Sequence, residues 1–208
     1  MARPKELEVV VAWYTEDLSW IPPAADPAVT VYSKNGGLGV APGERAWRVS
    51  QLPNVGREGH TYLRHIVDHY DDLADVTVFL QGDARPHSSP DVGSAVAALR
   101  SRDVQWFLNL GTDRVVTMTD FKCPHWTERG RDVTAAMYAE LFVSAAPRQV
   151  AFGAGALFAV TRAAVRFRSL AFWRRCLQYL EGGVDPVEGY AMERLWPLLF
   201  EPGLRARL

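Results

Sequence analysis

The sequence predicts a single α/β domain with a mostly parallel central sheet between two layers of helices. Two runs of β-branched and apolar residues, 8–14 and 76–82, are typical of fully buried strands. Segments of helical length separate these runs from further strand-like segments, and strands that alternate with helices favour a parallel sheet. With 208 residues and no internal repeat, the chain suits one core. We therefore expect one three-layer sandwich over residues 1–208, with the two runs as neighbouring, parallel, central strands.

The remaining elements are placed by hydrophobic pattern and by turn residues. Further strands are expected at residues 29–34, 115–118 and 149–160, and helices at 56–70, 90–99, 132–142, 170–180 and 187–200. Asn54 is placed to cap the first helix, and Ser89 to open the second. The glycine-rich stretch 35–43 is predicted to be a loop. Pro197 lies inside the last helix, which should tolerate it poorly.

Composition and charge exclude several classes of protein. The formal net charge of −1 and the 48 % of hydrophobic residues describe an ordinary globular chain, neither disordered nor uniformly basic. Two cysteines, Cys123 and Cys176, are too few for a disulfide framework or a four-cysteine zinc site. The sequence has no apolar run of spanning length, no leader and no phosphate-binding loop for ATP. We therefore expect a soluble, reduced, cytoplasmic protein that does not contact the membrane.

An aspartate follows directly after the clearest buried run. Residues 81–83 read Gln-Gly-Asp, and His87 follows four residues after Asp83. Ligands of open α/β sheets collect outside the carboxyl ends of the strands, so Asp83 is placed to contact a substrate or a metal, and His87 to share that rim. The alternative is that Asp83 only starts a turn and that His87 is solvated. We expect Asp83 to open onto the largest pocket, at the carboxyl edge of the sheet.

Polar residues gather at the start of the first predicted helix, where Asn54, Gly56, Arg57 and Glu58 follow one another closely. Exposed amides at a helix start attract anions, and Arg57 adds a fixed positive group, which predicts a substrate-binding position. A plain capped helix start, with Glu58 favoured by the helix dipole, explains the same residues. Both interpretations can hold together.

Glu188 and Glu193 stand near the start of the last predicted helix, beside Tyr190, Arg194 and Trp196. Carboxylates among aromatic residues can have raised pKa values and serve as acid or base, or they can bind a guanidinium group. Structural salt bridges are the alternative. Because they lie at strand ends or helix starts, five carboxylates are predicted to converge on one pocket. These are Asp17, Glu58, Asp83, Glu188 and Glu193.

Five arginines lie within 14 residues and alternate with aromatic side chains. They are Arg162, Arg166, Arg168, Arg174 and Arg175, which we call the arginine segment. A basic segment with interleaved aromatic residues is the best candidate in this near-neutral chain for contact with RNA phosphates. The alternative is an amphipathic helix whose arginines face water.

Four stretches together resemble a family called domain of unknown function 3431. They are VVAWYTEDLSW at residues 10–20, the stretch 52–83, GALFAVTRAAVRFR at 155–168 and EGYAMERLWPLLF at 188–200. The blocks NVGREGHTYL and VFLQGD are the most specific, and the resemblance covers nearly the whole chain. It implies a layout like a reduced glycosyltransferase-A sheet, in which a strand ends at an Asp-x-Asp that holds a metal and a nucleotide sugar. This sequence has one carboxylate there, Asp83, which is poor support for such a metal.

The family is also similar to the arginine-containing cyclodipeptide synthases of fungi, which join the amino acids of two aminoacyl-tRNAs. Aminoacyl esters are already activated, so such an enzyme requires no ATP site. The resemblance implies a transferase that uses arginyl-tRNA and a second aminoacyl-tRNA, with no cofactor, no metal and no stable protein partner. We predict Glu193, Glu188 and Asp83 as catalytic residues, Asp17, Asn54, Arg57, Glu58 and His87 as substrate-binding residues, and the arginine segment as the tRNA contact. A nucleotide-sugar transferase and a non-catalytic binding module on the same fold are the alternatives.

Overall fold

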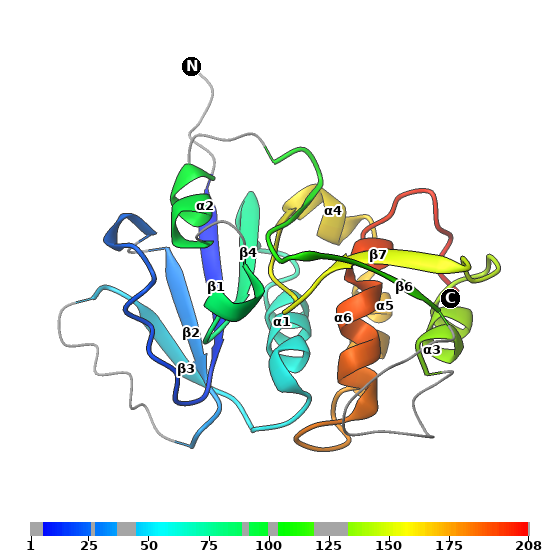
Figure 1. The fold of residues 1–208 in the computed structure, drawn as a ribbon, viewed down its shortest axis with the longest axis horizontal. Helices are drawn as coiled ribbons and strands as arrows, with labels where there is room; N and C mark the ends of the chain where they lie inside the picture. Colours follow the sequence, from blue (N-terminus) through cyan, green and yellow to red (C-terminus); the bar gives the residue numbers. More distant parts are fainter. Residues whose placement is uncertain are drawn as a thin grey trace.

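The computed structural model describes residues 6–25, 28–36, 45–88, 92–99, 104–118 and 133–207. A six-stranded sheet in the order β3-β2-β1-β4-β8-β5 forms the centre of the fold (Figure 1). Its strands are β1 (Leu7–Trp13), β2 (Val29–Ser33), β3 (Arg48–Gln51), β4 (Val76–Gln81), β5 (Phe107–Asn109) and β8 (Phe158–Thr161). The first four are mutually parallel, and β1 pairs directly with β4, as the two apolar runs predict. β8 is antiparallel to both of its neighbours.

The central strands are apolar along their whole length because the sheet is covered on both faces. Along β1, Val9 and Val11 belong to one hydrophobic cluster and Val10 and Ala12 to the other, and all four are buried. The helices α1 (Arg57–Asp68), α3 (Val133–Leu141), α4 (Arg162–Arg166), α5 (Leu170–Gln178) and α6 (Val187–Leu199) contribute to the first cluster. The opposite face is covered by α2 (Val92–Ala98) and the short η1 (Pro23–Ala25). The predicted three-layer sandwich is confirmed.

The predicted strand at 149–160 is two strands in two different sheets. β7 (Gln149–Gly153) pairs with β6 (Asp113–Thr117) in a two-stranded sheet, while β8 returns to the central sheet. The break lies at Gly155 and Ala156, whose φ angles are 81° and 51°. A side chain at Gly155 would collide with the Cβ of His87, 2.5 Å away, so the turn requires glycine. The apolar pattern of the segment conceals this turn because the residues on both sides of it are buried.

Helix boundaries also differ from the prediction at some positions. The residue before α1 is Gly56, with φ 63°, and no side chain caps this helix, so the prediction that Asn54 caps it is wrong. β3, β5 and α4 are too short to give a clear sequence pattern. α6 continues through Pro197, because this proline lies in the last turn, where few helical hydrogen bonds depend on it. The predicted Ser89 start, most of the predicted loop at 35–43 and Asp132 lie outside the described residues.

Candidate functional site

A cleft of about 550 Å³ opens at the carboxyl ends of β1, β2 and β4. The start of α1 and the loop between α5 and α6 form its other walls, so segments far apart in the sequence meet there. It is lined by Ala12, Trp13, Tyr14, Glu16, Lys34, Asn54, Arg57, Glu58, Gln81, Gly82, Asp83, Val184 and Asp185. This is the edge at which ligands of open α/β sheets collect.

A strained turn presents the start of α1 to this cleft. Gly56 and Arg57 both have left-handed backbone conformations, with φ angles of 63° and 53°. A Cβ on Gly56 would lie 2.3 Å from the main-chain oxygen of Leu180, so only glycine fits. The amides of Gly56 and Arg57 donate to the oxygens of Gly183 and Val184, at 2.7 and 3.2 Å. These bonds join the turn to the α5–α6 loop, and a non-glycine residue held in this conformation is typical of functional sites.

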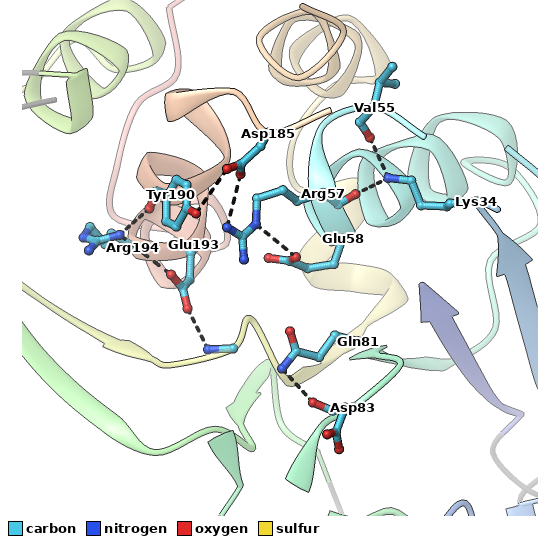
Figure 2. Close-up of polar contacts among 11 residues, drawn as sticks. Lys34, Val55, Arg57, Glu58, Gln81, Asp83, Asp185, Tyr190, Glu193 and Arg194 are labelled. Atoms are coloured by element: carbon cyan, nitrogen blue, oxygen red, sulfur yellow. Dashed lines mark hydrogen bonds and ion pairs between the residues drawn. The ribbon is translucent and has the colours of Figure 1, made fainter. Parts of the chain in front are cut away.

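Lys34 holds the same turn from the side of the sheet. Its Nζ, directly after β2, donates to the main-chain oxygens of Val55, at 2.5 Å, and of Arg57 (Figure 2). The residue is only 6 % exposed. Burial lowers the pKa of Lys34 to about 8, against the opposing effect of Glu58. Sequence reasoning missed Lys34, although the same strand-end rule that selected Asp83 applies to it.

Arg57 connects the turn with the beginning of α6. Its Nη1 lies 3.2 Å from Oδ1 of Asp185 and its Nε lies 3.6 Å from Oε2 of Glu58. The guanidinium carbon also lies 4.2 Å from the centre of the Tyr190 ring, in a cation–π contact. Tyr190 in turn donates from its hydroxyl to Asp185 at 3.4 Å. Arg57 is therefore committed to protein partners on three sides, as Figure 2 shows.

Glu58 and Glu193 bring two carboxylates from α1 and α6 into the same space (Figure 2). Oε1 of Glu193 accepts a hydrogen bond from the Gly155 amide at 2.6 Å, and its Oε2 lies 3.7 Å from Nη1 of Arg194. Burial raises the pKa of Glu193, and the charge of Glu58 raises it further, against the Gly155 amide, Arg194 and Arg57. Glu193 does not line the cleft, whereas Glu58 does. The raised pKa makes Glu193 a stronger proton acceptor than an exposed glutamate.

Asp83 lines the cleft, as its strand-end position predicts. Its Oδ1 pairs with Nε of Arg85 at 2.9 Å, and its main-chain oxygen accepts from Gln81 at 2.9 Å. A pocket at the other edge of the sheet is larger, about 650 Å³, so the prediction that Asp83 opens onto the largest pocket is wrong. Within the described ranges, no group of three His, Cys, Asp or Glu side chains could hold a metal ion.

The predicted convergence of five carboxylates is only partly realised. Asp17 is exposed and accepts hydrogen bonds from the amide and hydroxyl of Ser19 in its own loop. Glu188 is half-buried on α6 and His87 packs against Gly155, and neither lines the cleft. Asp17, Glu188 and His87 are therefore not brought to the cleft, whereas Glu58 and Asp83 are.

Glu16 and Asp185 were not selected from the sequence, yet both line the cleft. Glu16 accepts from the amides of Tyr14 and Thr15 at 2.8 and 3.1 Å. Its carboxylate lies over Gly82, where a Cβ would be 2.4 Å from Oε2. Both residues belong to loops, where no periodic pattern indicates which way a side chain points.

Three residues of the arginine segment have internal partners. Arg162 pairs with Asp75 at 3.1 Å, and Arg166 donates to the main-chain oxygens of Tyr70 and Asp71. Arg162 and Arg166 line the 650 Å³ pocket beside Asp75, which precedes β4, so they lie at the opposite end of β4 from Asp83. The expected continuous basic surface leading to the cleft is therefore not formed by these two residues.

Arg168 is 4 % exposed, and its guanidinium donates to the main-chain oxygens of Leu199, Glu201 and Leu204. The prediction that Arg168 contacts tRNA is therefore wrong, because its donors are used inside the protein. Arg174 is exposed and Arg175 is half-buried on α5. These two are the members of the arginine segment that the structure leaves at the surface without a bond to a main-chain oxygen among the contacts of the described residues.

Fold and cleft together define an α/β protein with a highly charged ligand site at the carboxyl ends of its parallel strands. The chain belongs to the family described as Protein of unknown function (DUF3431), whose model matches residues 9–205. No curated protein and no solved structure matches the chain. In the part of the chain that the structure describes, no helix is both long and apolar enough to cross a membrane.

Proposed function

We propose that this protein is an aminoacyl-tRNA-dependent cyclodipeptide synthase that joins arginine to a second amino acid. The observation that carries the proposal is the pair of carboxylates, Glu58 and Glu193, at the wall of the cleft. Formation of a peptide bond from two aminoacyl esters requires an ammonium group to lose a proton, and a carboxylate with a raised pKa is suited to accept it. Glu58 reaches the cleft, so it is the group placed to contact the substrate amine.

The charge balance of the cleft supports an arginyl substrate. Four carboxylates line it, those of Glu16, Glu58, Asp83 and Asp185, against the two cations Lys34 and Arg57. Both cations already have protein partners, Lys34 in main-chain oxygens and Arg57 in Asp185 and Glu58. A planar guanidinium group is well matched to paired carboxylate oxygens. The cleft therefore favours a cationic side chain over an anionic one.

The proposed reaction consists of two acyl transfers. In the first, the amine of one aminoacyl-tRNA attacks the ester carbon of the other, forming an amide and releasing one tRNA, whose ribose oxygen takes up a proton. In the second, the free amine of the dipeptidyl-tRNA attacks its own ester and releases the second tRNA and the cyclic dipeptide. Each step removes one proton from nitrogen and returns one to oxygen, so a single carboxylate that accepts and donates a proton serves both.

The tRNA contact is proposed for Arg174 and Arg175 alone. The chain leaves α5 at Leu180, whose main-chain oxygen touches Gly56 in the strained turn of the cleft. This helix therefore leads toward the cleft, unlike Arg162 and Arg166 at the other edge. Each phosphate contact releases condensed counterions, so binding should weaken with salt at a log–log slope of roughly −0.7 to −0.9 per contact.

A nucleotide-sugar transferase is the second candidate, because Asp83 follows β4 and lines the cleft. In that case the site would need a divalent cation bound by Asp83 and the sugar diphosphate. One carboxylate already paired with Arg85 is a weak ligand set for such an ion.

The deciding experiment is incubation of the protein with a total aminoacyl-tRNA mixture, followed by mass spectrometry of small products. We expect an arginine-containing cyclic dipeptide, and at least 100-fold less of it with Glu58→Gln, on the scale of general acid–base catalysis. Glu188→Gln is the matched control, since Glu188 lies outside the cleft, and it should keep near wild-type yield. If no cyclic product forms, while a nucleotide sugar is consumed in the presence of Mn²⁺, the sugar-transfer candidate replaces this one.

A further inference from the structure

Tyr62 places a hydroxyl group deep in the protein, directly below the two carboxylates of the site. The side chain is fully buried, and its ring packs against Phe79, Phe158 and Trp196, with ring centres 5.0, 5.9 and 5.9 Å away. Among the described residues, its hydroxyl has no hydrogen-bond partner. A buried hydroxyl without a partner costs about 1–3 kcal/mol, so phenylalanine would suit these surroundings better.

The position of Tyr62 on α1 connects it with Glu58. The two residues are four positions apart, on one face of the helix. Glu58 and Glu193 are the charged groups that act on the Tyr62 hydroxyl, whose pKa is raised by burial and then by these two carboxylates. The ring faces only aromatic groups on β4, β8 and α6. Glu193 is itself faced by Glu58 and Arg57 on α1, by Arg194 on α6 and by the Gly155 amide.

We propose that the Tyr62 hydroxyl joins Glu58 and Glu193 into one proton-sharing unit beneath the cleft. The hydroxyl rotates about its C–O bond and donates to whichever carboxylate is ionised, and it accepts from the one that is protonated. The unit then holds one proton between two carboxylates and offers a single negative charge to an organic cation in the cleft. Tyr62 is thus a positioning residue, which acts through the two glutamates and not on the ligand. The identity of that cation, an aminoacyl ammonium or guanidinium group, rests on the proposed function, whereas the coupling itself does not.

The test uses Tyr62→Phe, which keeps the ring and removes only the hydroxyl. Thermal unfolding is measured between pH 4 and 9 for wild type, Tyr62→Phe, Glu193→Gln and the double variant. Tyr138→Phe is the matched control, because Tyr138 is also buried and its hydroxyl bonds to Ser144. Donation by Tyr62 stabilises the ionised carboxylates, so its removal should move the Glu193-dependent loss of stability upward by roughly 0.5–1 pH unit.

In the Glu193→Gln background, Tyr62→Phe should no longer shift any pH transition. Tyr138→Phe should lower the unfolding temperature equally at every pH. A Tyr62→Phe effect that is uniform across pH and equal in both backgrounds, or no effect at all, overturns the proposal, because the hydroxyl would then be a buried group without a role.

Binding of agmatine, a guanidinium probe without an ester, supplies a second readout by calorimetry. Its pH dependence should shift in Tyr62→Phe in parallel with the stability data. If wild type makes no cyclic dipeptide while the stability coupling is present, the proposed function fails and the proton-sharing unit remains.

Discussion

The amide of Gly155 donates a hydrogen bond to Oε1 of Glu193 at 2.6 Å, across 38 positions of the sequence. The bond joins the turn between β7 and β8 to the first half of α6, and His87 packs against the same glycine. The left-handed conformation of Gly155 aims its amide at the carboxylate, with φ 81°. The orientation of Glu193 toward Glu58 thus depends on a turn that belongs to another part of the sheet.

Replacing Glu193 with Gln should change the pH dependence of stability in a defined direction. A carboxyl group whose pKa is raised on folding contributes stability below its unfolded pKa of about 4.3 and loses it as the pH rises through the folded value. Glutamine has no such transition. The difference in unfolding free energy, variant minus wild type, should therefore increase from pH 4 toward pH 8 in urea denaturation. A constant difference would contradict the raised pKa.

Gly56→Ala should destabilise the protein by about 2–4 kcal/mol, because the added Cβ meets the Leu180 oxygen and the backbone is left-handed. Gly182→Ala is the control in the α5–α6 loop, since nothing lies within 4 Å of its added Cβ. That variant should stay within about 0.5 kcal/mol of wild type. Urea unfolding at pH 7 measures both, and equal effects would argue against the described turn.

Arg168→Met should cost about 3–5 kcal/mol, because it leaves three buried main-chain oxygens without their charged donor. Arg174→Met, on the exposed face of α5, should change stability by less than about 0.5 kcal/mol. Chemical denaturation of the two variants separates an internal arginine from a surface arginine. A stable Arg168→Met protein would restore Arg168 as a candidate for tRNA contact.

The surface pair also allows a test of nucleic-acid binding. Arg174→Ala combined with Arg175→Ala should leave the unfolding midpoint unchanged and flatten the salt dependence of aminoacyl-tRNA binding by one or two contacts, each worth roughly 0.7–0.9 in log–log slope. Filter binding between about 50 and 200 mM salt covers the range in which such slopes are steep. Identical slopes would remove α5 from the tRNA contact.

Lys34 gives a second pH signature, of opposite sign. Its pKa of about 8 in the folded state lies below the unfolded value of about 10.4, so the unfolded chain binds more protons between these values. Wild type should therefore gain stability relative to Lys34→Met as the pH rises from about 8 to 10, by up to roughly 3 kcal/mol. The decisive quantity is the slope of this difference against pH. A flat difference would show that the amine is not buried as described.

The sequence by itself determined the centre of the fold and one rim of the site. The runs at 8–14 and 76–82 are apolar at every position because β1 and β4 are covered on both faces, so their burial is visible in composition alone. The rule that ligands collect at carboxyl ends of strands then placed Asp83 correctly, and the helix-start cluster placed Asn54, Arg57 and Glu58 at the cleft.

Only the tertiary structure decided how the site is assembled. Glu58 and Glu193 meet because α6 packs against α1 and the Gly155 turn orients Glu193, and no local pattern encodes a contact between such distant segments. Arg168 and Arg174 are also indistinguishable in sequence, since both are arginines among aromatic residues. The chain end that follows α6 supplies three main-chain oxygens to Arg168 and none to Arg174. Burial of a charged group depends on which segments surround it in space, and that information is distributed over the whole chain.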